Sequence, residues 1–239
     1  MDKVQIGLYL HDDTIGYRSV SCQPGKRSGD RRHGFTDEEV LMRQRAVVDQ
    51  PRSRLHPRAV RDRILDVAGD LFYQQGVRAV GVDLIVERSG VAKTSLYRYF
   101  ATKDDLVAAV LERADARYWA EWDARATREA DDPKRELEAH LEWIAADIAG
   151  PSYRGCPFLN VATEFPNSDH PGRIVAARHK RELHRRIAAL VVRMGLADSE
   201  RMADQLVLLI DGAYANGELL GLGGPARSLT AVARALISA

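Results

Sequence analysis

The stretch SGVAKTSLYRYFATKDDL, residues 89–106, carries the clearest structural signal in this sequence. Gly90 suits a tight turn because glycine readily adopts left-handed backbone conformations, and a short helix is expected after it, over residues 93–100. Leu96 and Phe100 are four residues apart, so they lie on one face and anchor that helix to a core. The other positions present a run of hydrogen-bond donors: Lys93, Thr94, Ser95, Tyr97, Arg98 and Tyr99. A helix with this surface suits a partner that is rich in hydrogen-bond acceptors.

Helical signals continue on both sides of this stretch. Thr102 and Asp105 form a capping box, which predicts the start of a long helix over residues 103–129. Apolar residues at helical spacing predict the other helices, over residues 57–76, 82–88, 133–150, 158–164, 171–194, 198–220 and 226–238. Period-two alternation is almost absent, so the sequence predicts an all-α fold.

The composition is that of a water-soluble protein. The chain has 239 residues, 45% of them hydrophobic and 29% charged, with a net charge of +1. Cys22 and Cys156 are too few and too distant to form a disulfide framework, which favours a reducing compartment. We expect no membrane-spanning helix and no signal peptide, because no apolar run reaches about 18 residues and the N-terminus lacks a long apolar region. A cytoplasmic location is therefore expected.

Residues 1–56 differ from the rest of the chain. They are rich in Gly, Ser, Pro and charged residues and have no sustained apolar period, so we expect a flexible basic extension with a short helix near residues 36–48. Between Arg43 and Arg63 there are seven Arg and two Asp. Such an arm either contacts nucleic acid or is a solvated linker. Met42 is a second candidate for the translation start, in which case residues 1–41 would not belong to the native protein.

Two short helices joined by a Gly turn, after a longer helix, form a helix-turn-helix. In this motif the second helix enters the major groove of DNA and offers donors to phosphates and base edges. A net charge near zero is compatible with this function, because one short helix does most of the recognition. The sequence therefore predicts a three-helix DNA-binding domain over residues 57–102 and a helical domain over residues 103–239.

Residues 61–111, RDRILDVAGDLFYQQGVRAVGVDLIVERSGVAKTSLYRYFATKDDLVAAVL, resemble the N-terminal domain of the tetracycline-repressor (TetR) family of bacterial transcription regulators. Beyond Leu111 the resemblance weakens to an all-helical pattern. The fragment RGCPFLN, residues 154–160, resembles a motif in one branch of these regulators. The resemblance implies a homodimer with two helix-turn-helix domains, each followed by a helical core that binds a small molecule and mediates dimerisation.

The resemblance also implies which residues contact DNA. In the recognition helix they are Lys93, Thr94, Ser95, Tyr97, Arg98 and Tyr99. The cationic and hydroxyl side chains would approach phosphates and base edges, and the tyrosines would contact phosphates or the thymine methyl group. Lys103 would hold a phosphate at the N-terminus of the long helix, where the helix dipole helps. Many members have Ser or Thr where Gly81 stands and a polar residue where Leu84 stands, so the phosphate contact usual at the first position is in question.

The helical domain is expected to dimerise and to hold a ligand. The apolar helix near residues 206–214 and the stripe over residues 229–237 are the candidates for a dimer interface, because two half-sites require two recognition helices at a fixed spacing. The alternative is that both helices only complete the core of one chain. A pocket between the middle helices would be lined by aromatic residues with a few polar anchors, from the set Trp119, Trp122, His140, Trp143, Phe158, Asn160, Glu164, Phe165, Asp211 and Tyr214.

Other chemistry finds little support in the sequence. There is no HExxH, CxxC, GxSxG or P-loop motif, so we expect no catalytic residue, metal site or cofactor. Cys156 is expected to be a packed thiol, with a redox sensor as the alternative. The basic run over residues 178–186 is expected to be a solvated helix face, with a second anion site as the alternative. The predicted function is a repressor released from a palindromic operator by a small molecule; the rivals are an activator, a ligand-independent regulator, an all-helical enzyme and a dimerisation module.

Overall fold

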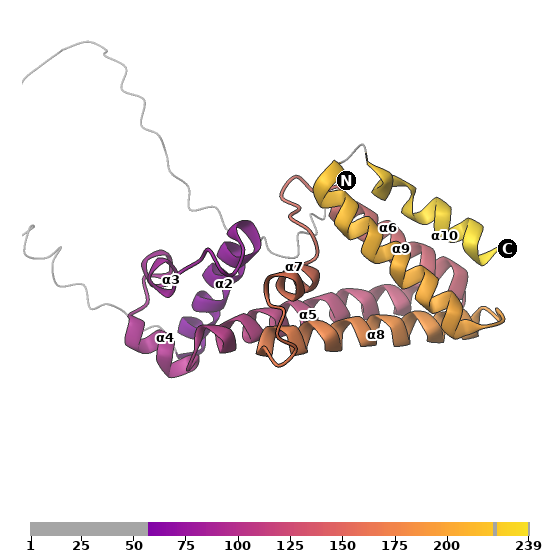
Figure 1. Ribbon diagram of the computed structural model, residues 1–239. Helices are drawn as coiled ribbons and strands as arrows, with labels where there is room; N and C mark the ends of the chain where they lie inside the picture. The colour runs from indigo at the N-terminus through magenta and orange to yellow at the C-terminus, as the bar shows by residue number, and fades with distance from the viewer. Residues whose placement is uncertain (1–56, 222–223, 239) are drawn as a thin grey trace, which may run out of the picture. The chain divides into compact units, whose positions relative to one another are not determined.

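The computed structural model describes residues 57–221 and 224–238, and all the regular structure within them is helical (Figure 1). The elements in chain order are α2 (Pro57–Gln75), α3 (Val82–Ser89), α4 (Lys93–Tyr99), α5 (Lys103–Arg128), α6 (Pro133–Ile148), α7 (Pro157–Glu164), α8 (Pro171–Arg193), α9 (Ser199–Leu220), the 3₁₀ turn η1 (Pro225–Ser228) and α10 (Leu229–Ile237). The predicted all-α fold is confirmed. The expectations for residues 1–56, including the flexible extension and the alternative start at Met42, lie outside the described residues.

The helix ends agree with the predicted ones to within a few residues because local signals set them. Thr102 Oγ1 accepts a hydrogen bond from Asp105 N at 3.0 Å, and the Asp105 carboxylate accepts one from Thr102 N at 3.0 Å, so the capping box is present. Asp132 accepts hydrogen bonds from two backbone amides at the start of α6. The end of the chain differs from the prediction, since the expected single helix over residues 226–238 is a 3₁₀ turn beginning at Pro225 followed by α10.

The first three helices bury one small apolar core. Ile64 and Leu65 of α2, Ile85 of α3 and Leu96 of α4 are all at most 1% exposed. Phe100, just after α4, is also buried. The predicted anchoring of α4 through its i and i+4 positions is therefore confirmed, and it holds this short helix in place by packing more than by its own helix propensity.

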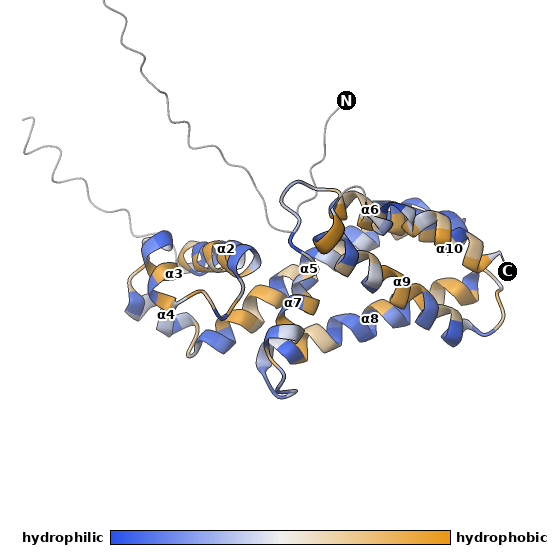
Figure 2. Cartoon of the chain, turned by 45° about the horizontal axis from the view of Figure 1, so that its top comes forward, coloured by the Kyte–Doolittle hydropathy of each residue, from blue (hydrophilic) through white to orange (hydrophobic). Residues whose placement is uncertain are grey.

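The remaining helices form a bundle around α8 and α9. α8 packs against α5, α7 and α9, while α6 packs against α9 and α10 (Figure 1). Apolar and polar residues alternate around these helices (Figure 2), as expected for helices with one buried face. Gly217 of α9 is buried against Ile148 of α6, where a Cβ on the glycine would lie 2.2 Å from Ile148 Cγ2. The close approach of α9 to the end of α6 therefore requires glycine.

Candidate nucleic-acid interface

The turn between α3 and α4 is held by short-range contacts. Gly90 has a left-handed backbone (φ 64°), and its N–H donates to the carbonyl oxygens of Val86 and Glu87. Ser89 is fully buried; its hydroxyl donates to Val86 O and accepts from Val91 N, at 3.3 Å in both cases. The turn is thereby rigid enough to fix the direction of α4 relative to α3, as a helix-turn-helix requires.

The face of α4 opposite the core is polar and accessible. Lys93, Thr94 and Arg98 are exposed, and Tyr97 is 44% exposed. Ser95 and Tyr99 are half-buried, and the Arg98 guanidinium lies 5.2 Å from the centre of the Tyr99 ring. The structure thus brings the six predicted DNA-contacting residues of α4 onto one short helix, four of them exposed. Their contact with DNA stays a prediction.

Lys93 has an acidic neighbour that the sequence reasoning missed. Its Nζ lies 2.6 Å from Oδ1 of Asp83, in the first turn of α3, and both side chains are exposed. The hydrogen bond to Asp83 raises the pKa of Lys93. The ten-residue separation between the two residues offers no periodic signal in the sequence, because they lie on different helices.

Lys103 is placed differently from what a phosphate contact needs. Its Nζ donates to Val77 O at 2.6 Å and lies 5.9 Å from the centre of the Phe72 ring. Burial lowers the pKa of this half-buried lysine. In this conformation Lys103 ties the start of α5 to the turn after α2, and its role as a phosphate ligand remains a prediction.

Gly81 caps α3 without a side chain. It has an extended backbone (φ −80°, ψ 153°), and no side-chain hydrogen bond caps the helix. A Cβ at Gly81 would meet nothing within 4 Å. The site therefore has room for the Ser or Thr that the family resemblance leads one to expect. Leu84, the second departure, is half-buried against the core, which explains an apolar residue there.

Helix α7 holds the helix-turn-helix region to the rest of the chain. The Glu164 carboxylate accepts from Val77 N at 2.9 Å and from Arg78 N at 2.8 Å, in the turn after α2. The Tyr73 hydroxyl of α2 donates to Gly155 O at 3.1 Å and accepts from Arg154 N at 2.8 Å, in the loop before α7. We call these contacts of Glu164 and Tyr73 the α7 junction.

The predicted ligand-site residues fall into two groups. Asn160 and Glu164 line a small cavity between α2, α5 and α7, about 320 Å³ in volume including its open mouth. Asn160 Nδ2 also donates to Arg154 O at 2.8 Å, so it supports the loop before α7. The second group lies deeper in the bundle and consists of Trp119, Trp122, His140, Trp143, Phe158 and Tyr214. The two remaining predicted residues make other contacts: Phe165 stacks on His170, and Asp211 forms an ion pair with Lys180.

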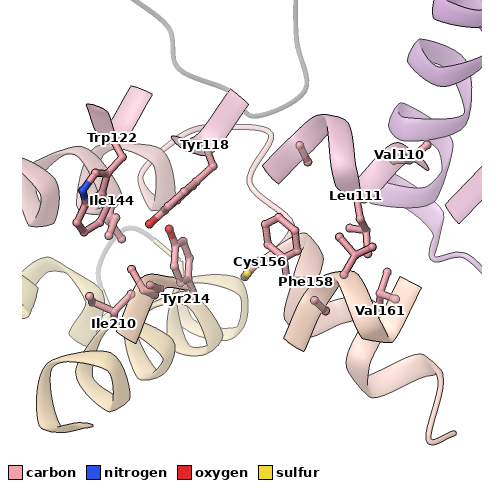
Figure 3. Close-up of a cluster of buried hydrophobic side chains, with 14 of the residues drawn as sticks. Val110, Leu111, Tyr118, Trp122, Ile144, Cys156, Phe158, Val161, Ile210 and Tyr214 are labelled. Atoms are coloured by element: carbon pink, nitrogen blue, oxygen red, sulfur yellow. The ribbon is translucent and has the colours of Figure 1, made fainter. Parts of the chain in front are cut away.

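The deeper group is an aromatic cluster around Tyr118, which the sequence reasoning did not select. The Tyr118 ring lies 4.8 Å from that of Trp143 and 4.9 Å from that of Trp119, measured between centroids. His140 stacks on Trp122 with ring centroids 3.6 Å apart. Figure 3 shows the Tyr118 and Tyr214 hydroxyls pointing toward one another between Trp122 and Phe158. The aromatic cluster comprises Tyr118, Trp119, Trp122, His140, Trp143, Phe158, His179 and Tyr214, with His179 stacked on Phe158 and lying against Tyr118.

Two buried side chains of this cluster have ring nitrogens without a hydrogen-bond partner within the described residues: both ring nitrogens of His140, of which Nε2 lies 3.7 Å from Glu136 Oε1, and Nε1 of Trp143. Burial, with the charges of Arg125 and Arg186, lowers the pKa of His140 to about 3, so its ring is neutral at pH 7. Buried polar groups are normally paired, which marks this cluster as a place where a water or a ligand would gain hydrogen bonds.

The other predicted features have structural explanations. Cys156 is a buried thiol at the start of α7, as expected of a packed residue (Figure 3). In the basic run of α8, most cations pair with acids of the same chain, for example Arg186 with Glu182 and Lys180 with Asp211. Within the described ranges, no group of three or more His, Cys, Asp or Glu residues is placed to hold a metal ion. None of the described helices is long and apolar enough to cross a membrane.

Comparison with known proteins agrees with this geometry. The family model described as bacterial regulatory proteins, tetR family, matches residues 64–110. An uncharacterised helix-turn-helix transcriptional regulator of Bacillus subtilis is 27% identical over 163 residues, covering 68% of this chain and 84% of that protein. A helix-turn-helix transcriptional repressor of Mycobacterium tuberculosis is 31% identical over 135 residues, covering 55% of this chain and 69% of that protein. The crystal structure of a TetR-family transcriptional regulator from Streptomyces coelicolor is 30% identical with a TM-score of 0.72, covering 75% of this chain and 94% of that one.

Proposed function

The chain belongs to the TetR family of helix-turn-helix transcriptional regulators, and we propose that it is a homodimeric repressor that leaves a palindromic operator when a small molecule binds its core. Membership of this family makes it a DNA-binding regulator and not an enzyme. The observation that supports DNA recognition by α4 is the exposure of Lys93, Thr94 and Arg98 on a helix whose opposite face is fully buried. We divide the chain into a DNA-binding part, residues 57–102, and a regulatory part, residues 103–239, and place it with the chromosome in the cytoplasm.

The DNA-binding proposal is tested by selecting operators from random duplexes with the purified full chain and then comparing variants. Lys93→Ala and Arg98→Ala should each weaken binding to the selected duplex, by about 1–3 kcal/mol if the side chain reads a base edge. Lys134→Ala is a matched control, because Lys134 is an exposed cation at the start of α6. Operator affinity unchanged in both α4 variants would show that α4 is not the recognition helix.

The proposed dimer rests on apolar side chains that the chain itself leaves exposed. Leu208 and Leu219 on α9 are 72% and 79% exposed, and Val232 on α10 is 47% exposed. Leu208 and Leu219 are eleven residues apart and share a helix face, with Gly212 and Ala215 between them. By contrast, the predicted interface residues Leu206, Ile210, Tyr214, Leu229 and Ala233 are buried within the chain, so they complete its own core. We propose that the outer faces of α9 and α10 pair with the same helices of a second copy in a four-helix arrangement.

Sedimentation measurements test this interface. Leu208→Glu should shift the chain toward the monomer, because it places a charge on the apolar pairing face. Val192→Glu is the matched control, since Val192 is a 62% exposed apolar residue on α8. A wild-type chain that is monomeric at micromolar concentration, or a Leu208→Glu variant as dimeric as the control, would reject the interface.

We place the effector in the aromatic cluster. Its support is the combination of stacked aromatic rings with the unpaired ring nitrogens of His140 and Trp143. A ligand that forms these missing hydrogen bonds would separate the rings, and the adjoining α5 would have to move because Tyr118 and Trp122 belong to it. To change the chain from mostly bound to mostly released, the ligand must prefer the released form by about 5 kcal/mol.

The α7 junction would carry this movement to the DNA-binding part. Phe158, one wall of the aromatic cluster, lies on the same short helix as Glu164, which binds the turn after α2. Lys103 binds the same turn from α5. Displacement of α7 or α5 would therefore shift α2 to α4 as a unit and change the spacing of two recognition helices across the dimer.

The rival is an activator or a regulator that needs no ligand. It is distinguished by measuring operator binding with and without an extract of cellular metabolites, followed by transcription from the operator in vitro. Metabolite-dependent release together with increased transcription supports the repressor. Tight binding that no fraction changes, or transcription that falls when the protein is removed, supports the rival.

A further inference from the structure

The ion pair between Asp83 and Lys93 calls for an explanation other than fold stability. The Lys93 Nζ–Asp83 Oδ1 distance is 2.6 Å, yet the side chains are 51% and 84% exposed. Ion pairs between exposed side chains contribute little to stability. A carboxylate on this surface also repels phosphates, so it opposes the nonspecific electrostatic attraction on which DNA binding depends.

The pair is well matched to one feature of the major groove. The Lys93 ammonium is a strong donor, the Asp83 carboxylate is a strong acceptor, and the two lie side by side. They belong to the first turns of α4 and α3, which are joined by a rigid turn. A G·C pair presents two guanine acceptors, N7 and O6, beside one donor, cytosine N4. An A·T pair places its only donor, adenine N6, between two acceptors, N7 of adenine and O4 of thymine. A carboxylate directed at that donor would meet repulsion from both sides.

We infer that Asp83 and Lys93 together read a G·C base pair in each half-site of the operator, with Lys93 donating to guanine and Asp83 accepting from cytosine N4. The inference rests on the proposed binding of DNA through α4. It makes Asp83 a specificity-determining residue. The ion pair holds the lysine ammonium in place before DNA arrives, so less of its freedom is lost on binding.

Operator selection from random duplexes tests the inference when it is run in parallel on the full-length wild type, Asp83→Ala, Lys93→Ala and the double variant. The wild type should require G·C at one symmetry-related position of each half-site. Asp83→Ala should relax the preference at that same position by roughly five- to a hundredfold. Lys93→Ala should relax it too, and the double variant should lose less than the product of the single losses, because the two residues act as one unit.

Asp66→Ala is the matched control. Asp66 is an exposed aspartate whose carboxylate lies 2.6 Å from a cation, Arg113, but that cation belongs to α5 and not to the recognition helix. The operator sequence selected by Asp66→Ala should equal the one selected by the wild type. Because Asp83 is exposed, the variant should fold normally, which circular dichroism checks.

Two outcomes would overturn the inference while leaving DNA binding intact. If Asp83→Ala binds every duplex more tightly with an unchanged consensus, Asp83 only offsets charge. If the position that relaxes is A·T, the pair reads a different edge. A wild-type protein that enriches no sequence would instead refute the proposed function, and the inference with it.

Discussion

The contact most open to a quantitative test is the one between Glu164 and the turn after α2. The Glu164 carboxylate accepts from the N–H groups of Val77 and Arg78, at 2.9 and 2.8 Å. Glu164→Ala removes both acceptors. Val77 is 2% exposed, so its N–H would be left without a partner, which costs about 1–3 kcal/mol. Arg78 is exposed, so water can replace the carboxylate there and that loss should be small.

We therefore expect Glu164→Ala to lower the free energy of unfolding by about 1–3 kcal/mol. The assay is urea unfolding at pH 7, at one protein concentration, because dimerisation would make the stability depend on concentration. Glu112→Ala is the matched control, since Glu112 is an exposed glutamate on α5. Hydrogen exchange of the Val77 amide should also become faster in Glu164→Ala, while the amides in the middle of α5 stay protected.

The reasoning fails if Glu164→Ala and Glu112→Ala unfold at the same urea concentration and the Val77 amide remains equally protected. In that case the α7 junction would be held by the Tyr73 contacts alone, with Lys103 of α5 binding the turn after α2 beside it. If Glu164→Ala is destabilised as expected, its response to the proposed effector should also weaken, because a contact between α7 and the turn after α2 is lost.

Three further changes have outcomes that follow from the structure. Gly217→Ala should destabilise the chain by about 2 kcal/mol or more in urea unfolding, because the new Cβ would overlap Ile148. Gly81→Ser should raise the free energy of unfolding by a few tenths of a kcal/mol in urea unfolding, because the hydroxyl can cap α3. It should also tighten operator binding in a salt-dependent way through a new phosphate contact. If the unfolding free energy and the operator affinity both stay unchanged, the serine does not act as this cap. Burial raises the pKa of Asp147 to about 7, so the folded chain keeps a proton that the unfolded chain, with a pKa near 3.8, releases. Stability should therefore fall as pH rises from about 4 to about 7, and Asp147→Asn should remove this fall and be more stable at pH 8 by about 1–3 kcal/mol, as measured by thermal unfolding across that pH range.

Much of the fold and the recognition helix was predictable because the signals are local. Leu96 and Phe100 point inward because side chains four residues apart share a helix face, and the capping box of Thr102 and Asp105 spans only four residues. Helix α4, the proposed recognition helix, could be placed in this way, and the residues that face away from the core followed. The candidate ligand site was predicted less well, because most of its aromatic members were named but Tyr118 at their centre was not. Helical spacing alone does not show which aromatic residue lies at the centre of a cluster.

The sequence by itself thus determined the helices, their order and the donor-rich surface of α4, since each depends on residues a few positions apart. Only the tertiary structure decided which charges those donors meet and which helices communicate. Lys93 meets Asp83 on another helix, Lys103 turns to Val77, and Glu164 reaches a turn 86 residues before it. Such contacts depend on how the helices pack in three dimensions, and the periodicity of a single sequence does not reveal that packing.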